Sequence, residues 1–432
     1  QAFRAACIVS GYMSLLTRCL VALLVTSLRS VATSPRCKAL ASDRCAHLCE
    51  PVSPEARPVS LARRLLTPGR RWSRGWLNST RRPRRPSARA LGKCPCQKAD
   101  LEVQALLLKC ESEAIVTVFA PGLDGSACYR IPSIIRTSRG TLLAFAEQRI
   151  DSCADNGRIN LVLRRSLDDG QTWGEVITVA EGNGQALSNV NPLQVDLGGK
   201  RAILVHFDTQ NNPTSGMHGR NVQKWSHDDG LSWSAGEDIT SMMPEGYGGC
   251  MPGPSVGVQG SDGTLYFSCH GFGEYSFLYW SKDLGSTWTA SDVLPFLDEC
   301  SIAALPDQSI AMNCRTKGRR RAQVTWVDGA LSNIIYPEGL ADPNCQGSIQ
   351  FLSEKLYLSN DNSRTERSHL TVKSSADGGT TWDSGREIWS GPSGYSQLLG
   401  WQAEEGHVLG VLFELGLEQP HERIGFTTWS IG

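Results

Sequence analysis

The chain of 432 residues carries 43 Lys and Arg and 43 Asp and Glu, so its formal net charge is zero, and 40% of its residues are hydrophobic. The charges are unevenly placed, because residues 1–100 hold 19 basic and 4 acidic side chains and the rest of the chain is acidic. This asymmetry predicts two chemically different regions and excludes a uniformly basic nucleic-acid binder. The composition also excludes wholesale disorder and a polytopic membrane protein.

The segment that begins at Met13 has the order of a secretory signal. A basic start is followed by an apolar run over 19–28 and by small residues at Ser30 and Ala32. Such a run is too short to span a bilayer. A buried helix, or translation from upstream of the true start, would produce the same pattern, so these alternatives stay open.

Residues 57–98 are rich in Arg, Ser and Pro and show little apolar periodicity. A stretch of this composition buries too little surface to offset the entropy lost on ordering. We therefore expect residues 1–110 to form a signal-like, basic extension that is disordered or removed. An organelle transit peptide and a polyanion-binding tail are alternatives. The fifteen cysteines show no zinc-ligand spacing and leave the redox compartment open.

From residue 111 onward, short apolar and β-branched runs alternate with Gly, Asp and Ser turns, which predicts an all-β domain over 111–432. Within it the pattern S-x-D-x-G-x-[TS]-W occurs at 166–173, 226–233, 281–288 and 375–382. The Asp can close the turn by accepting backbone N–H bonds, the Gly permits a positive φ, and the Trp anchors the loop. The spacing leaves room for a degenerate copy before the last one and predicts a six-bladed β-propeller.

Upstream of the first repeat lie the tetrapeptide Tyr-Arg-Ile-Pro at 129–132 and the segment 140–149. With these motifs, residues 114–432 resemble the exo-α-sialidases (neuraminidases), most closely the animal lysosomal type. The repeats are similar to the Asp boxes of that family. The resemblance implies a sialidase-like propeller that cleaves sialic acid, a sugar whose anomeric carbon bears a carboxylate.

The resemblance implies that three arginines bind this carboxylate, a task that suits planar guanidinium groups. By motif they are Arg130, Arg315 and Arg367. The second and third positions have rivals in Arg319, Arg320, Arg321 and Arg364. The basic run 317–321 is interpreted as an exposed loop.

A carboxylate nucleophile would be repelled by the carboxylate of the substrate, whereas a neutral tyrosine hydroxyl would not, and sialidases depart from the two-carboxylate scheme in this way. The resemblance assigns Tyr395 as the nucleophile and Glu299 as its base. It also implies an aspartic acid that protonates the leaving oxygen. Asp155 is favoured over Asp151 for this role.

Glu414 is a charged residue inside an apolar strand, and a buried carboxylate needs a partner. The resemblance implies that Glu414 orients Arg130 and that Arg149 contacts the ring-hydroxyl side of the sugar.

We therefore expect hydrolysis of terminal α-linked sialic acids from glycoproteins, glycolipids and oligosaccharides, with retention at the anomeric carbon. A non-catalytic glycan- or protein-binding propeller and a trans-sialidase are the alternatives. No metal or organic cofactor is implied. The expected partners are sialylated glycoconjugates, including gangliosides in ganglioside catabolism, and not nucleic acid. The expected location is the secretory pathway, lysosomal or extracellular, with an organelle addressed by the Arg- and Ser-rich leader as the alternative.

Overall fold

The computed structural model describes residues 115–431, except 211–218, 244–248 and 272–273. The predicted signal and the Arg-, Pro- and Ser-rich extension lie outside the described residues. In the described part, no helix is long and apolar enough to cross a membrane.

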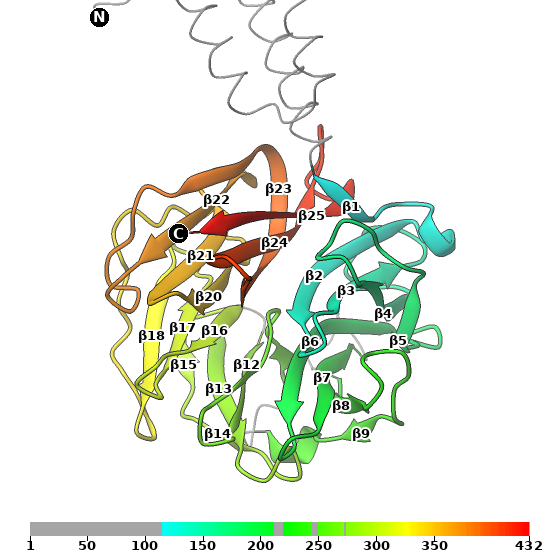
Figure 1. The fold of residues 1–432 in the computed structure, drawn as a ribbon, viewed down its shortest axis with the longest axis horizontal. Helices are drawn as coiled ribbons and strands as arrows, with labels where there is room; N and C mark the ends of the chain where they lie inside the picture. Colours follow the sequence, from blue (N-terminus) through cyan, green and yellow to red (C-terminus); the bar gives the residue numbers. More distant parts are fainter. Residues whose placement is uncertain (1–114, 211–218, 244–248, 272–273, 432) are drawn as a thin grey trace, which may run out of the picture. The chain divides into compact units, whose positions relative to one another are not determined.

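The described residues form six blades of antiparallel strands around a common centre, so the all-β, six-bladed propeller is confirmed (Figure 1). Blade 1 contains β2 (Cys128–Arg136), β3 (Leu142–Arg149), β4 (Ile159–Ser166) and β5 (Ile177–Ala180). Blade 2 contains β6 (Ala186–Asp196), β7 (Arg201–Gln210), β8 (Asn221–Ser226) and β9 (Glu237–Asp238). Blade 3 contains β10 (Met251–Pro252), β11 (Val258–Gln259), β12 (Leu265–Gly271), β13 (Tyr275–Ser281), β14 (Thr289–Ala290) and β15 (Leu294–Pro295).

The second half of the ring completes the propeller and joins its ends. Blade 4 contains β16 (Cys300–Ala304), β17 (Ile310–Cys314), β18 (Ala322–Val327) and β19 (Ala330–Leu331). Blade 5 contains β20 (Ser348–Leu352), β21 (Lys355–Asp361), β22 (Ser368–Ser375) and the first part of β23 (Arg386–Gln402). Blade 6 contains the rest of β23, β24 (His407–Leu415), β25 (Arg423–Ile431) and β1 (Val116–Phe119). Short 3-10 turns are η2 (Leu123–Gly125) and η3 (Thr240–Met242).

The ring is closed by pairing between the two ends of the described chain. Strand β1 pairs antiparallel with β25, with Val116 opposite Phe426. Strand β23 changes sheets along its length, because its first residues pair with β22 and its residues from Ser393 onward pair with β24. Tyr395, the predicted nucleophile, lies in this crossing segment.

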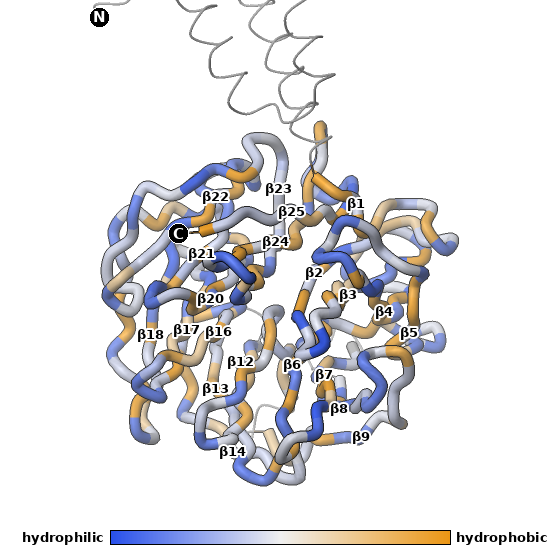
Figure 2. Tube along the Cα trace, in the orientation of Figure 1, coloured by the Kyte–Doolittle hydropathy of each residue, from blue (hydrophilic) through white to orange (hydrophobic). Residues whose placement is uncertain are grey.

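Apolar side chains fill the spaces between neighbouring blades. Between blades 6 and 1, the buried residues include Phe119, Tyr129, Leu142 and Phe426. Figure 2 shows apolar residues along much of the strands and hydrophilic residues gathered in several of the connecting loops. Burial on both faces explains why strands such as β3 and β24 appear in the sequence as nearly continuous apolar runs.

Each of the four predicted repeats forms a turn after the third strand of its blade, in blades 1, 2, 3 and 5. In the first, the Ser166 hydroxyl lies 2.7 Å from Asp168 Oδ1 and accepts the Gly170 N–H at 2.8 Å, and Gly170 has a φ of +90°. Asp168 also accepts the backbone N–H of Thr172 at 2.9 Å. Blade 4 has a short hairpin at 327–330 in the same place, which is the predicted degenerate copy.

Candidate active site

A cavity of about 320 Å³ lies at the end of the blades where the inner strands begin. Seven of the eight residues predicted for the site line it, and the eighth, Glu414, lies directly behind Arg130. The seven are Arg130, Arg149, Asp155, Glu299, Arg315, Arg367 and Tyr395. The structure therefore brings together residues that the sequence spreads over more than 260 positions.

The Glu414 carboxylate joins Arg130 to the chain that carries Tyr395. It accepts Arg130 Nε at 3.0 Å and Nη2 at 3.1 Å, and it also accepts the backbone N–H groups of Ile131 and Tyr395. Burial opposes the charge on Glu414, but Arg130 and His421 outweigh it and hold the pKa of the carboxyl well below its usual range. Gly394 must lack a side chain, because a Cβ there would lie 2.4 Å from Glu414 Oε2.

Arg149 fastens the loop that carries Asp155. Its Nη1 donates to Asp155 Oδ1 at 2.7 Å and to the carbonyl oxygen of Cys153 at 2.6 Å, and buried Glu147 accepts its Nη2 at 2.6 Å. A disulfide between Cys128 and Cys153 ties the same loop to the start of β2. Asp155 itself is 77% exposed and faces the cavity. The carboxyl group is therefore held from behind and open to a ligand in front.

Tyr395 lies in the middle of the site between a carboxylate and a guanidinium. Its hydroxyl donates to Glu299 Oε1, and Arg315 Nη1 lies 3.1 Å from the same hydroxyl. Glu299 Oε2 in turn accepts Arg315 Nη1 at 2.8 Å. The guanidinium carbons of Arg130 and Arg367 lie 5.1 and 5.7 Å from the centre of the Tyr395 ring. Three guanidinium groups therefore converge around one phenol.

The protonation states of this pair suit proton transfer from the phenol. Burial, followed by the charge of Glu299, raises the pKa of the Tyr395 hydroxyl well above its ordinary value. Burial would also raise the pKa of Glu299, but Arg315, His270 and the bond from Tyr395 lower it overall. At neutral pH, Tyr395 is therefore a neutral hydroxyl beside an ionised carboxylate, which is the arrangement a base-activated nucleophile needs.

Arg315 and Arg367 are held by one loop residue, Asn344. Asn344 Oδ1 accepts Arg315 Nε at 2.9 Å, and its carbonyl oxygen lies 3.5 Å from Arg367 Nη2. Asp342 fixes the backbone of this loop by accepting the N–H groups of Asn344 and Cys345. Arg321 binds Asp342 at 3.0 Å, and both side chains are fully buried.

The structure also shows where the rival residues lie relative to the cavity. Arg321 is buried and braces the Asn344 loop, because it donates to Asn313 and pairs with Asp342. The interpretation of 317–321 as an exposed loop is therefore wrong for its last residue. Arg319 and Arg364 are exposed, and Arg319 donates to the backbone of Arg364 outside the cavity. Asp151 pairs with exposed Arg158. None of the rivals Arg319, Arg320, Arg321, Arg364 and Asp151 lines the cavity, whereas Arg315, Arg367 and Asp155 do.

Several residues at the site were missed by the sequence analysis. They are Glu147, Ser188, Asn189, Met251, His270 and Asp298, which line the cavity, and Asn344, which lies behind it. Glu147 carries the same signal as Glu414, an acidic residue within an apolar run, and that signal could have found it. Asn344 and His270 have no such signal, because their roles depend on contacts between blades.

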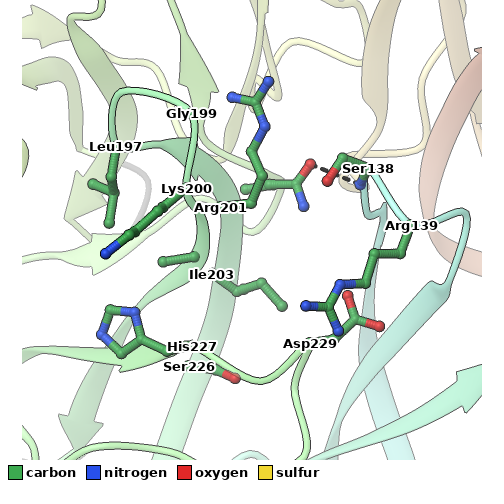
Figure 3. A pocket seen from close by; sticks show the side chains of 12 residues that line it. Ser138, Arg139, Leu197, Gly199, Lys200, Arg201, Ile203, Ser226, His227 and Asp229 are labelled. Carbon is green, nitrogen blue, oxygen red and sulfur yellow. Dashed lines mark hydrogen bonds between the residues drawn. The ribbon is translucent and has the colours of Figure 1, made fainter.

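A larger cavity of about 610 Å³ lies at the opposite end of blades 1 and 2, beside the second Asp box (Figure 3). Arg139, Lys200 and Arg201 surround it, and Asp229 is bonded to Thr141 and Arg165. Arg201 pairs with Asp196. This cavity contains no tyrosine or paired carboxylates, and none of the residues predicted for the site lines it.

The fold and the cavity define a propeller with an arginine-rich site for an anionic ligand. A family model described as "BNR repeat-like domain" matches residues 138–409. The chain belongs to this family. Among its relatives is a sialidase of Bacteroides fragilis, 28% identical over 343 residues, which cover 68% of this chain and 61% of the relative.

Solved sialidase structures share the fold. The Hadza microbial sialidase Hz136 has a TM-score of 0.64 at 24% identity, with 71% of this chain and 66% of that chain covered. The intramolecular trans-sialidase from Ruminococcus gnavus has a TM-score of 0.60 at 16% identity, with 73% and 97% covered.

Proposed function

We propose that this protein is an exo-α-sialidase, a retaining glycoside hydrolase that uses Tyr395 as its nucleophile. One observation carries the proposal: the Tyr395 hydroxyl donates to the buried Glu299 carboxylate while Arg130, Arg315 and Arg367 surround the phenol. A carboxylate on the reacting carbon would pair with these guanidinium groups and so bring that carbon toward the Tyr395 hydroxyl oxygen. The sialidase relatives support the same function.

In the first step, the Tyr395 oxygen attacks the anomeric carbon and its proton passes to Glu299. The glycosidic C–O bond breaks, and Asp155 donates a proton to the leaving oxygen. In the second step, water attacks the same carbon, Asp155 takes a proton from the water, and the bond to Tyr395 breaks as Glu299 returns its proton. Two displacements at one carbon retain its configuration.

Asp155 must be protonated for the first step, although the charges of Arg149 and Arg130 hold its pKa below the usual value. The Arg130 Nη1 atom lies 3.3 Å from Asp155 Oδ1. A substrate carboxylate that pairs with Arg130 would compete for this contact and add a negative charge beside Asp155, and both effects raise the pKa of Asp155. Substrate binding would thus prepare the acid for its role.

The decisive experiment measures release of a fluorophore from an aryl α-sialoside by the wild-type protein and by Tyr395→Phe and Asp155→Ala. We expect losses of at least about 100-fold in kcat for each, the usual contribution of a positioned acid or base. Tyr357→Phe and Asp151→Ala are the matched controls, because Tyr357 and Asp151 lie outside the cavity, and they should retain activity. Binding of a sialoside without turnover by folded wild-type protein would instead support a non-catalytic propeller.

We propose further that the protein is of the animal lysosomal type and acts on glycoproteins, glycolipids such as gangliosides, and oligosaccharides in the secretory pathway, a lysosome or the extracellular space. Three disulfides in the propeller support such a compartment, because disulfides persist where the environment is oxidising. A trans-sialidase would use the same residues. Product analysis in the presence of lactose separates the two activities, because only transfer yields a new sialyl-lactose.

A further inference from the structure

A third cavity, of about 500 Å³, shares no lining residue with the catalytic cavity, and the proposed chemistry does not use it. Part of its wall comes from the two segments that carry Glu299 and Arg315, which places it next to them in the fold. Phe296 lies three residues before Glu299, and Thr316 directly follows Arg315. The other lining residues are Glu274, Lys317, Gly318, Arg320 and Tyr336.

Phe296 presents its ring to the solvent from a fixed backbone. It is 81% exposed, while its neighbour Leu297 is fully buried. Its N–H donates to the carbonyl oxygen of Glu274 at 2.8 Å, and its φ is +63°, a left-handed conformation that disfavours bulky residues. The exposed ring of Phe296 buries little apolar surface and so adds little to the stability of the fold. Exposed apolar side chains on a strained backbone often mark contact sites for ligands.

Tyr336 supplies a second aromatic surface in the same cavity. Arg320 packs against it, with its guanidinium carbon 3.8 Å from the ring centre, and Tyr336 remains 40% exposed. Glu274 and Lys317 add an acceptor and a donor of opposite charge to the same walls. The cavity therefore offers aromatic rings together with both kinds of hydrogen-bonding group, and its charged lining residues are one carboxylate and two cations, one of which packs on Tyr336.

We propose that this cavity binds the neutral sugar next to the sialic acid, the part of the substrate that leaves. A pyranose ring has an apolar C–H face that can lie on Phe296 or Tyr336, and its hydroxyls require both donors and acceptors. Because the catalytic cavity is about 320 Å³ and holds the terminal sugar, the next sugar must lie outside it. The inference rests on the proposed sialidase function and names its preferred substrate as an oligosaccharide chain.

The test compares two substrates that share the sialic acid and differ in the leaving group. Sialyllactose carries two neutral sugars, and α-sialyl fluoride carries none. We expect Phe296→Ala and Tyr336→Ala to lower kcat/KM for sialyllactose by about 5- to 10-fold, the size of the loss of one stacking contact. The same variants should hydrolyse sialyl fluoride at the wild-type rate. Phe296→Trp, which keeps an aromatic face, should retain most of the wild-type kcat/KM for sialyllactose.

Leu167→Ala is the matched control, because Leu167 is 77% exposed and lies in the first Asp box, at the opposite end of its blade. Leu167→Ala should hydrolyse both substrates at the wild-type rate. An equal loss of both substrates in Phe296→Ala, or no loss of either, would overturn the proposal. A dimer that dissociates in Phe296→Ala without any change in sialyllactose hydrolysis would also overturn it, in favour of self-association.

A failure of the proposed function has a different outcome, because the wild-type protein would then hydrolyse neither substrate. In that case the cavity is tested by measuring how sialyllactose and free sialic acid bind to the Tyr395→Phe variant. Calorimetry should give tighter binding of sialyllactose than of free sialic acid, with the difference lost in the Tyr395→Phe/Phe296→Ala double variant. Equal affinities for the two ligands would overturn the proposal.

Discussion

The two ends of the propeller blades hold their carboxylates in different ways. At the Asp-box end, Asp168, Asp283 and Asp377 lie near the surface, and each is satisfied within its own eight-residue turn. At the active-site end, Glu414 and Glu299 are buried, and each has a partner from another blade, Arg130 and Tyr395 respectively. The Asp-box end is thus a set of independent local turns, whereas the active-site end is one network assembled around the ring.

The disulfides follow the same division. Cys128–Cys153 ties the Asp155 loop, Cys250–Cys269 ends beside His270, and Cys300–Cys314 joins the strands that carry Glu299 and Arg315. Within the described residues, no disulfide lies in an Asp box. A network of buried charges from several blades has no local turn to fix its geometry, and covalent links supply that restraint.

The largest expected effect comes from removing the charge of Glu414. In Glu414→Gln, Arg130 keeps its burial and loses its buried counter-charge, leaving only exposed Asp155, and breaking a buried pair in this way costs about 3–5 kcal/mol in the free energy of unfolding. Denaturant unfolding measures the loss, and the same variant should lose most of its activity. Asp168→Asn, at the Asp-box end, is the control and should cost less. Equal losses in the free energy of unfolding for the two variants would contradict the difference between the active-site end and the Asp-box end.

The next effect concerns the disulfide that holds the Asp155 loop. Replacing Cys128 and Cys153 by Ala removes a restraint on a 25-residue separation and should lower the free energy of unfolding by about 3 kcal/mol. Because the loop carries the proposed acid, activity should fall more for a methyl sialoside than for a nitrophenyl sialoside, whose leaving group needs less protonation. Replacing Cys250 and Cys269 by Ala should cost similar stability without this preference. The same substrate ratio in both double variants would contradict a special role for the first disulfide.

A smaller effect is expected from the loop that holds two arginines. Asn344→Ala removes the acceptor for Arg315 Nε, a hydrogen bond to a charged group, and should raise KM by about 10-fold with a smaller change in kcat. Steady-state kinetics with an aryl sialoside measures KM and kcat separately. Asn333→Ala, at an exposed position of blade 4, should leave both constants unchanged. A loss confined to kcat would show that Asn344 acts on chemistry and not on substrate binding.

The smallest effect is the pH dependence of the Asp boxes. Bonds from Thr hydroxyl and backbone groups, then from Ser, lower the pKa of Asp168, Asp283 and Asp377 to about 2. Because the folded-state pKa lies below the unfolded value, this stabilisation is present above about pH 4 and is lost as the pH falls toward 2. Calorimetry between pH 5 and 2 should show a flatter fall of Tm in Asp377→Asn than in the wild type. Parallel curves would show that Asp377 contributes no such dependence.

The sequence by itself determined the parts of this protein that are local. The Asp boxes, the number of blades and the all-β class follow from patterns in which each residue bonds to others within four positions. The tyrosine, the glutamate and the three arginines were predicted from motifs similar to those of sialidases. Blade 4 could be expected to lack its box, because the spacing of the others left room for one unit.

Only the tertiary structure decided what depends on contacts between distant residues. Arg130 and Glu414 are 284 positions apart, so no local pattern states that one orients the other. The choice of Asp155 over Asp151, the burial of Arg321 and the role of Asn344 depend likewise on which loops meet at the centre. The opposite charges of residues 1–100 and of the rest of the chain decided none of these points, because an acidic propeller gathers its cations in one cavity only when the ring of blades closes.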